Sequence, residues 1–128
     1  MGRIYSLANQ KGGVGKTTTA VNLGAYLAHM GQRVLLVDLD PQANATSSLG
    51  VDKNALSRSV YDVLIGSETP ASLTLVTTCL GLDLLPASPA LAGAEVELLN
   101  VIARETRLRH ALQQVSGRYD YILIDTPP

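Results

Sequence analysis

Two of the three lysines in this chain, Lys11 and Lys16, lie five residues apart in the glycine-rich stretch NQKGGVGKTTTA. Gly12, Gly13 and Gly15 leave room for backbone N–H groups to approach an anion without obstruction by Cβ atoms. A helical pattern follows the loop directly, so the positive end of a helix would point at the same place. These features predict a loop that cradles phosphate groups, with Lys16 as a point charge reaching the terminal phosphates.

Oxygen-bearing side chains near this loop predict a magnesium site beside the phosphates. The Thr17 hydroxyl can ligate a magnesium ion, and the loop nearly matches the P-loop pattern G-x-x-x-x-G-K-[ST], with Gln10 in place of the first glycine. Asp125 ends the apolar run YILID and could hold the ion through water. Asp38 and Asp40 end the apolar run RVLLVDLD. Ligands of open α/β sheets lie beyond the carboxyl ends of the strands, so these acids should face one crevice.

Alternating strand and helix patterns are expected to position these residues. Strands are expected at 3–8, 33–40 and 82–88 and in YDYILIDTPP, and helices at 16–30, 59–66 and 91–115, with Gly31 and Gly117 ending two of them. Residues 41–59 suggest a loop with short helical turns at most. Strands that alternate with helices indicate an α/β fold, a doubly wound and mainly parallel sheet with right-handed crossovers.

Composition describes a core-rich globular domain. Hydrophobic residues make up 46% of the 128 residues and charged residues 16%, and no run approaches the roughly 18 apolar residues of a membrane span. A net charge of −1 offers no global attraction to nucleic acid. Cys79 is the single cysteine, which excludes an internal disulfide and a cysteine-built metal site within one chain. The start MGRIYSLANQ carries no export pattern, so a cytoplasmic location is expected.

The remaining candidate residues favour structural roles. His29 and His110 lie on expected helices without acids or cysteines at ligand spacing, which favours solvated or packed histidines over metal ligands. The arginines of the long helix could contact DNA, but a solvated helix face is the stronger interpretation; they are Arg104, Arg107 and Arg109. Asp38 could also merely end its strand.

Several motifs together resemble one family. KGGVGKTT, residues 11–18, is similar to the deviant Walker A loop of the ParA and MinD superfamily; DLDPQ resembles its second acidic motif and YILIDTPP its Walker B strand. ANATSSLG, YDVL and LLPASPALAGAEVEL resemble the ParA and Soj branch of partition ATPases. The resemblance covers all 128 residues, with Ala43 where the branch usually has glycine.

The resemblance implies an ATPase that binds ATP with Mg²⁺. By this similarity Lys16 contacts the chain's own nucleotide, Lys11 crosses a dimer interface to the partner's phosphates, and Asp40 orients or activates the attacking water. The implied catalytic residues are Lys11, Lys16 and Asp40; the implied metal-site residues are Thr17, Asp38 and Asp125; and the implied nucleotide-binding residues are Lys11, Gly12, Gly13, Val14, Gly15, Lys16, Thr17 and Thr18.

The family likeness further implies a nucleoid-associated partition protein. An ATP-dependent homodimer would bind DNA nonspecifically, and a ParB-type centromere-binding partner would stimulate hydrolysis; no membrane partner is expected. The alternatives are a MinD-like membrane-associated regulator and a nucleotide-binding regulatory module without turnover. Residues 1–128 are expected to be the N-terminal part of a single P-loop ATPase domain, incomplete and inactive alone. Its strand YILI would then be uncovered or at a sheet edge and would promote association.

Overall fold

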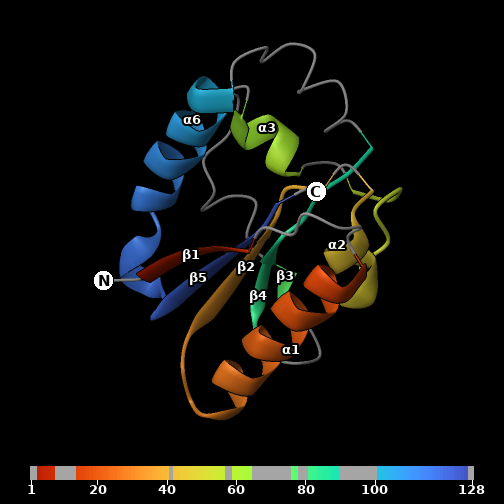
Figure 1. Ribbon diagram of the computed structural model, residues 1–128, viewed down its shortest axis with the longest axis vertical. Helices are drawn as coiled ribbons and strands as arrows, with labels where there is room; N and C mark the ends of the chain where they lie inside the picture. Colours follow the sequence, from red (N-terminus) through yellow and green to blue (C-terminus); the bar gives the residue numbers. More distant parts are fainter. Residues whose placement is uncertain are drawn as a thin grey trace.

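A computed structural model of the chain describes residues 3–7, 14–40, 42–56, 59–64, 76–77, 81–89 and 101–126. Strands and helices alternate through these residues, as the sequence predicts (Figure 1). The strands are β1 (Arg3–Leu7), β2 (Val34–Asp38), β3 (Val76–Thr77), β4 (Asp83–Leu85) and β5 (Tyr121–Asp125). The α-helices are α1 (Val14–His29), α2 (Asn44–Ser48), α3 (Val60–Leu64) and α6 (Val101–Gln113), and a 3₁₀ helix, η1, covers Ser116–Arg118.

The strands form one sheet in the order β1-β5-β2-β4-β3. All neighbouring pairs are parallel except β3 and β4, which are antiparallel. The predicted fold class, an α/β fold with a mainly parallel sheet, is therefore confirmed. β5 lies between β1 and β2, so the expectation that the YILI strand would be uncovered or at an edge is wrong. A strand rich in β-branched and large aliphatic residues suits this position because both of its faces are covered.

Helices cover both faces of the sheet, as a doubly wound fold requires (Figure 1). Alternate residues along a strand point to opposite faces, so β2 supplies Leu35 and Val37 to one core and Val34 and Leu36 to the other. The first core includes residues of α3 and α6, and the second includes residues of α1 and α2. The largest fully buried side chains are Leu35, Leu36, Leu64, Leu82, Leu84, Leu85, Leu112, Ile122, Leu123, Val37 and Val60.

Some elements differ from the sequence expectations. The short antiparallel strand β3 was not expected, and β4 (Asp83–Leu85) is shorter than the strand expected at 82–88. The five-residue helix α2 agrees with the short helical turns expected within 41–59. The long helix expected at 91–115 is α6 at 101–113, and residues 91–100 lie outside the described part. Short elements carry too few residues for a periodic pattern, so their packing against the sheet decides their structure.

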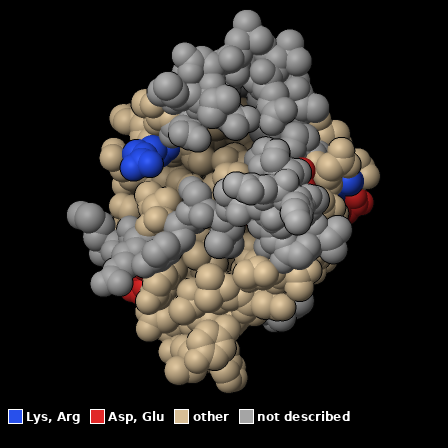
Figure 2. Space-filling view, viewed as in Figure 1, with Lys and Arg blue, Asp and Glu red and all other residues tan. Residues whose placement is uncertain are grey.

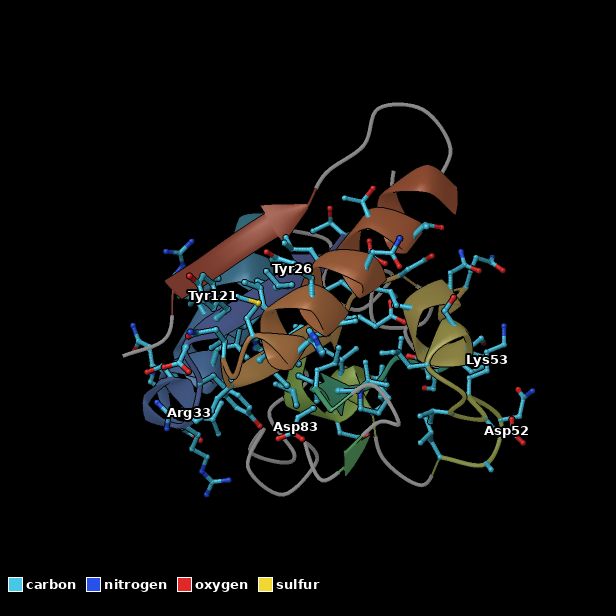
Figure 3. The ribbon with its side chains drawn as sticks, turned by 90° about the horizontal axis from the view of Figure 1, so that it is seen from below. Tyr26, Arg33, Asp52, Lys53, Asp83 and Tyr121 are labelled. Carbon is cyan, nitrogen blue, oxygen red and sulfur yellow. The ribbon has the colours of Figure 1, made fainter. Side chains whose placement is uncertain are left out.

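An ion pair aligns β2 and β5 at the end of the sheet opposite the strand-end acids. The Arg33 guanidinium lies 3.1 Å from Asp120, and the Arg33 backbone N–H donates to the same carboxylate at 2.8 Å. Both side chains are partly solvated, and Arg33, labelled in Figure 3, holds the pKa of Asp120 below its usual range through a hydrogen bond. The Asp120 N–H returns a bond to the Arg33 carbonyl at 2.7 Å. This pairing supports the register that places Asp38 opposite Asp125.

Gly24 lets α1 pack closely against the sheet. A Cβ atom at this position would lie 3.2 Å from a Leu82 methyl group, 3.7 Å from Leu123 and 3.8 Å from Val34. The closest of these contacts is tighter than an ordinary van der Waals separation, so a larger side chain would push the helix outward. Because α1 begins at Val14, its distance from the sheet also sets where the N-terminus of the helix lies.

Replacing Gly24 with valine should therefore lower the free energy of unfolding by about 1–3 kcal/mol, the usual cost of overpacking a core. Asn22→Val, on the exposed face of the same helix, is the matched control for the effect of a β-branched residue on α1. Urea denaturation of both variants gives the comparison. Equal stability of the two variants would contradict close packing at Gly24.

Candidate functional site

Two buried carboxylates lie side by side where β2 and β5 end. Asp38 and Asp125 occupy paired positions in the parallel register, and both side chains have no solvent exposure. The Leu39 N–H continues the ladder by donating to the Asp125 carbonyl at 2.9 Å. The sheet thus brings together two of the three acids that the sequence places at strand ends. Strands that run in one direction end at one edge, where ligands of open α/β sheets bind (Figure 1).

The Asp38 carboxylate accepts three hydrogen bonds from the segment that follows it. Its Oδ1 accepts from the Asp40 N–H at 3.0 Å. Its Oδ2 accepts from the Thr46 N–H at 2.9 Å and from the Thr46 hydroxyl at 2.7 Å. Burial raises the pKa of Asp38 to about 6, with a smaller contribution from the neighbouring Asp125, while the bonds from Thr46 and Asp40 act in the opposite direction. The hydrogen bonds from Asp40 and Thr46 are thus the contacts that favour the ionised form of Asp38.

Asp40 sits in a tight turn immediately after β2 and is 5% exposed. Its Oδ1 accepts from the Gln42 N–H at 3.0 Å, and its Oδ2 accepts from the Asn44 side-chain amide at 2.9 Å. The Asp40 carbonyl accepts from the Ala43 N–H at 2.8 Å, which closes the turn. Bonds to both oxygens fix the orientation of the carboxylate, so its position is largely set before any ligand binds.

The turn depends on an unusual backbone conformation at Ala43. Its φ of 55° and ψ of 41° place it in the left-handed region. No other non-glycine residue in the described ranges has a positive φ. An alanine there costs about 1–2 kcal/mol relative to the right-handed conformation. The ParA and Soj branch, which the sequence resembles, usually has glycine at this position, and glycine adopts the left-handed conformation freely. Ala43 is buried in the core cluster beside β2, so its methyl group offsets part of the cost.

The phosphate-loop predictions fall partly outside the described residues. Lys11, Gly12 and Gly13 lie outside them. The next four predicted residues form the first turn of α1, which begins at Val14, as the sequence requires for a phosphate at a helix N-terminus. They are Val14, Gly15, Lys16 and Thr17. Thr18 follows on α1 with an exposed side chain.

The described site fits a hard divalent cation beside an anion. Two buried, adjacent carboxylates at Asp38 and Asp125 concentrate negative charge, and magnesium takes one or two carboxylates together with substrate phosphates. The helix N-terminus at Val14 supplies the partial positive charge that an anion needs. Among the described residues, no group of three or more His, Cys, Asp or Glu side chains gathers to hold a metal ion. The assignment of Thr17, Asp38 and Asp125 to magnesium stays a prediction.

Three residues around the acids were missed as functional candidates: Asn44, Thr46 and Ala87. Asn44 and Thr46 occur in ANATSSLG, which the sequence marks only as a family-like motif, and Ala87 follows β4. The Thr46 hydroxyl accepts from the Ala87 N–H at 3.0 Å. A polar residue in a short helix gives no periodic signal that it is buried, so the sequence contained no sign of this contact.

The other candidate residues whose side chains the structure describes lie at the surface, while Cys79 and the Arg104 side chain lie outside the described part. His29 and His110 are exposed, in agreement with the solvated interpretation. Arg107 donates to the Leu64 carbonyl at 3.1 Å at the end of α3, and Arg109 is exposed. In the view of Figure 2, the charged side chains of the described residues lie toward the left and right margins, and a basic and an acidic side chain adjoin at the right. No helix within the described ranges is long and apolar enough to cross a membrane.

Comparison with known proteins agrees with the fold. The model of a family described as AAA domain matches residues 2–128. Soj, the sporulation initiation inhibitor protein of Bacillus subtilis, is 56% identical over 128 residues, which cover 100% of this chain and 51% of Soj. The chromosome partitioning protein ParA of Myxococcus xanthus is 50% identical, with 100% of this chain and 45% of that protein covered.

A solved structure shows the same fold with nucleotide bound. It is described as the cobyrinic acid a,c-diamide synthase of Mycobacterium smegmatis with a bound ATP analogue and magnesium. It is 50% identical to this chain, with a TM-score of 0.93, and the alignment covers 100% of this chain and 52% of that one. The chain thus spans about half the length of the proteins that it matches. With its residues 2–128 matched by this family model, the chain belongs to the AAA domain family, and over its whole length it is similar to Soj and to the chromosome partitioning protein ParA.

Proposed function

We propose that residues 1–128 are the N-terminal part of a single P-loop ATPase domain that binds and hydrolyses Mg²⁺-ATP in chromosome or plasmid partition. The observation that carries the proposal is the meeting of Asp38, the Asp40 turn and Asp125 at one edge of the sheet. The first turn of α1, with its GKT sequence, begins at the residue after the glycine pair of the loop. Soj and ParA relatives of half identity or more support the partition context.

Different residues of this chain bind the nucleotide and catalyse its hydrolysis. Residues 11–18 surround the phosphates with backbone N–H groups, and Lys16 adds its charge to them. Thr17 and Asp125, with Asp38 nearby, would hold a magnesium ion, which would supply positive charge to offset that of the phosphate oxygens. Asp40 orients the attacking water through a carboxylate that Gln42 and Asn44 keep in place.

The proposed assembly makes hydrolysis depend on a second copy of the chain. Lys11 reaches the phosphates of the partner subunit and adds positive charge as the bond to the leaving oxygen breaks. The ATP-bound homodimer then binds DNA nonspecifically through regions outside this chain and associates with the nucleoid. A ParB-type partner stimulates hydrolysis and so releases the dimer.

The test is ATP turnover by the full-length protein, measured alone, with nonspecific DNA, and with DNA plus the cognate centromere-binding protein. We expect slow turnover alone and the highest rate with both additions. ATP binding without turnover in any mixture would favour a regulatory module. Sedimentation with anionic vesicles that depends on ATP would favour a MinD-like regulator.

The Mycobacterium smegmatis structure is described as a diamide synthase, so diamide synthesis is a second activity to test. The full-length protein incubated with ATP, cobyrinic acid and an amide-nitrogen donor should form no diamide if the partition proposal is correct. Formation of a diamide would replace it.

A further inference from the structure

Thr46 connects the loop that carries Asp40 to two strands of the sheet. It is fully buried in α2, although its side chain is polar. Its hydroxyl donates to Asp38 at the end of β2 at 2.7 Å and accepts from the Ala87 N–H beyond β4 at 3.0 Å. The Thr46 N–H adds a second bond to Asp38 at 2.9 Å. One side chain therefore joins α2 to the ends of β2 and β4.

Asp38 contacts both ends of the segment between residues 40 and 46. Its Oδ1 accepts from the Asp40 N–H, while its Oδ2 accepts both bonds from Thr46. Both oxygens thus contact the segment between residues 40 and 46. On the outer side of this segment, the Lys53 ammonium donates to the Gln42 carbonyl at 2.9 Å. Figure 3 shows Lys53 beside α2, on the far side of the molecule from Arg33.

These contacts leave the loop few alternative positions. A shift of α2 would break the Asp38–Thr46 hydrogen bonds and leave a buried carboxylate oxygen and the Ala87 N–H without partners, which is costly away from water. The Asp40 N–H is bonded to Asp38, and the Asp40 carboxylate accepts from Gln42 and Asn44 of the same segment, so a displaced segment would carry the carboxylate with it. The anchoring also explains how the left-handed Ala43 is maintained, since the surrounding structure must hold a strained residue in place.

We propose that Asp38 and Thr46 are positioning residues that hold Asp40 in the orientation needed for ATP hydrolysis. The inference rests on the proposed ATPase function and adds to it a role for Thr46 and a role for Asp38 that does not require contact with the metal. A displaced catalytic group lowers turnover more than it lowers nucleotide binding, because the contacts to the phosphates come from another loop.

The experiment compares Thr46→Val, which removes the hydroxyl at nearly constant shape, with Thr46→Ser, which keeps it, in the full-length protein. Ser47→Ala, which removes an exposed hydroxyl from the same helix, is the matched control. We expect Thr46→Val to lower kcat by about 10- to 100-fold. The ATP dissociation constant and the Mg²⁺ concentration for half-maximal turnover should stay within threefold of wild type, and Thr46→Ser and Ser47→Ala should keep kcat within threefold.

Hydrogen exchange of peptides covering residues 40–49 gives a readout that does not need turnover. Thr46→Val should exchange faster there than wild type, Thr46→Ser and Ser47→Ala. This measurement separates failure of the anchor from failure of the proposed function, since it applies even if wild type hydrolyses no ATP. Unchanged exchange, or an unchanged kcat in folded Thr46→Val, would overturn the proposal.

A second variant covers the case in which Thr46→Val does not fold. Asp38→Asn keeps the side-chain shape but replaces one accepting oxygen with a donor. It should lower kcat while the Mg²⁺ requirement stays within threefold. A tenfold higher Mg²⁺ requirement with full turnover at saturation would instead make Asp38 part of the metal site and overturn the positioning role.

Discussion

Replacing Asp40 with alanine should lower ATP turnover by about 10²–10⁴-fold, the range for loss of a group that assists proton transfer. The physical reason is the fixed carboxylate: Gln42 and Asn44 bond its two oxygens at 3.0 Å and 2.9 Å, and its backbone is bonded to Asp38. Such a group is already oriented when the nucleotide binds. ATP binding should persist because the phosphate contacts come from residues 11–18, and the protein should accumulate as its ATP-bound dimer.

Two further variants separate charge from shape at this position. Asp40→Asn keeps an oxygen that can accept from the Gln42 N–H but loses the negative charge, so it should be nearly as slow as Asp40→Ala. Asp52→Ala removes an exposed acid from the loop after α2 and should hydrolyse ATP at the wild-type rate (Figure 3). Single-turnover hydrolysis and light scattering measure the rate and the dimer. Wild-type turnover in Asp40→Ala would exclude the assigned role.

Alanine replacement of the two loop lysines should have different effects: loss of ATP affinity at Lys16, and loss of ATP-dependent dimerisation at Lys11. Lys16→Ala deletes the main charge directed at the chain's own nucleotide. A hydrogen bond to a charged group contributes about 1.5–3 kcal/mol, so ATP affinity should fall by roughly 10- to 100-fold or more. Equilibrium binding of a fluorescent ATP analogue gives the value. Affinity within twofold of wild type would refute this role of Lys16.

Lys11→Ala should spare binding and remove assembly. Its proposed target is the nucleotide of the partner subunit, so the dissociation constant for ATP should stay within threefold while ATP-dependent dimerisation is lost. Turnover should fall by about 10³-fold, the lower range for loss of a cation supplied in trans to a phosphoryl group. Light scattering with ATP, together with steady-state turnover, tests this pattern. Normal dimers with normal turnover would contradict action across the interface.

The sequence alone determined the fold class, and it predicts phosphate binding by the glycine-rich loop. The nearly continuous apolar run at β2, ending in aspartate, indicated a parallel strand covered on both faces, and the run at β5 indicated a strand but not its place inside the sheet. The GKT sequence also indicated that a helix follows the glycine loop, and α1 begins at Val14, two residues before the expected start at Lys16. Both signals are local in the chain, so no knowledge of tertiary contacts is needed to interpret them.

Tertiary structure decided how the acids are arranged and what holds them. The position of β5 between β1 and β2 comes from strand pairing between segments more than 80 residues apart, and it sets Asp38 beside Asp125. Thr46 becomes an anchor only when α2 packs against β2 and β4, because its partner Ala87 lies 41 residues away in the sequence. Residue type and local spacing carry no information about such contacts, because they join segments that are far apart in the chain and adjacent only in the folded structure.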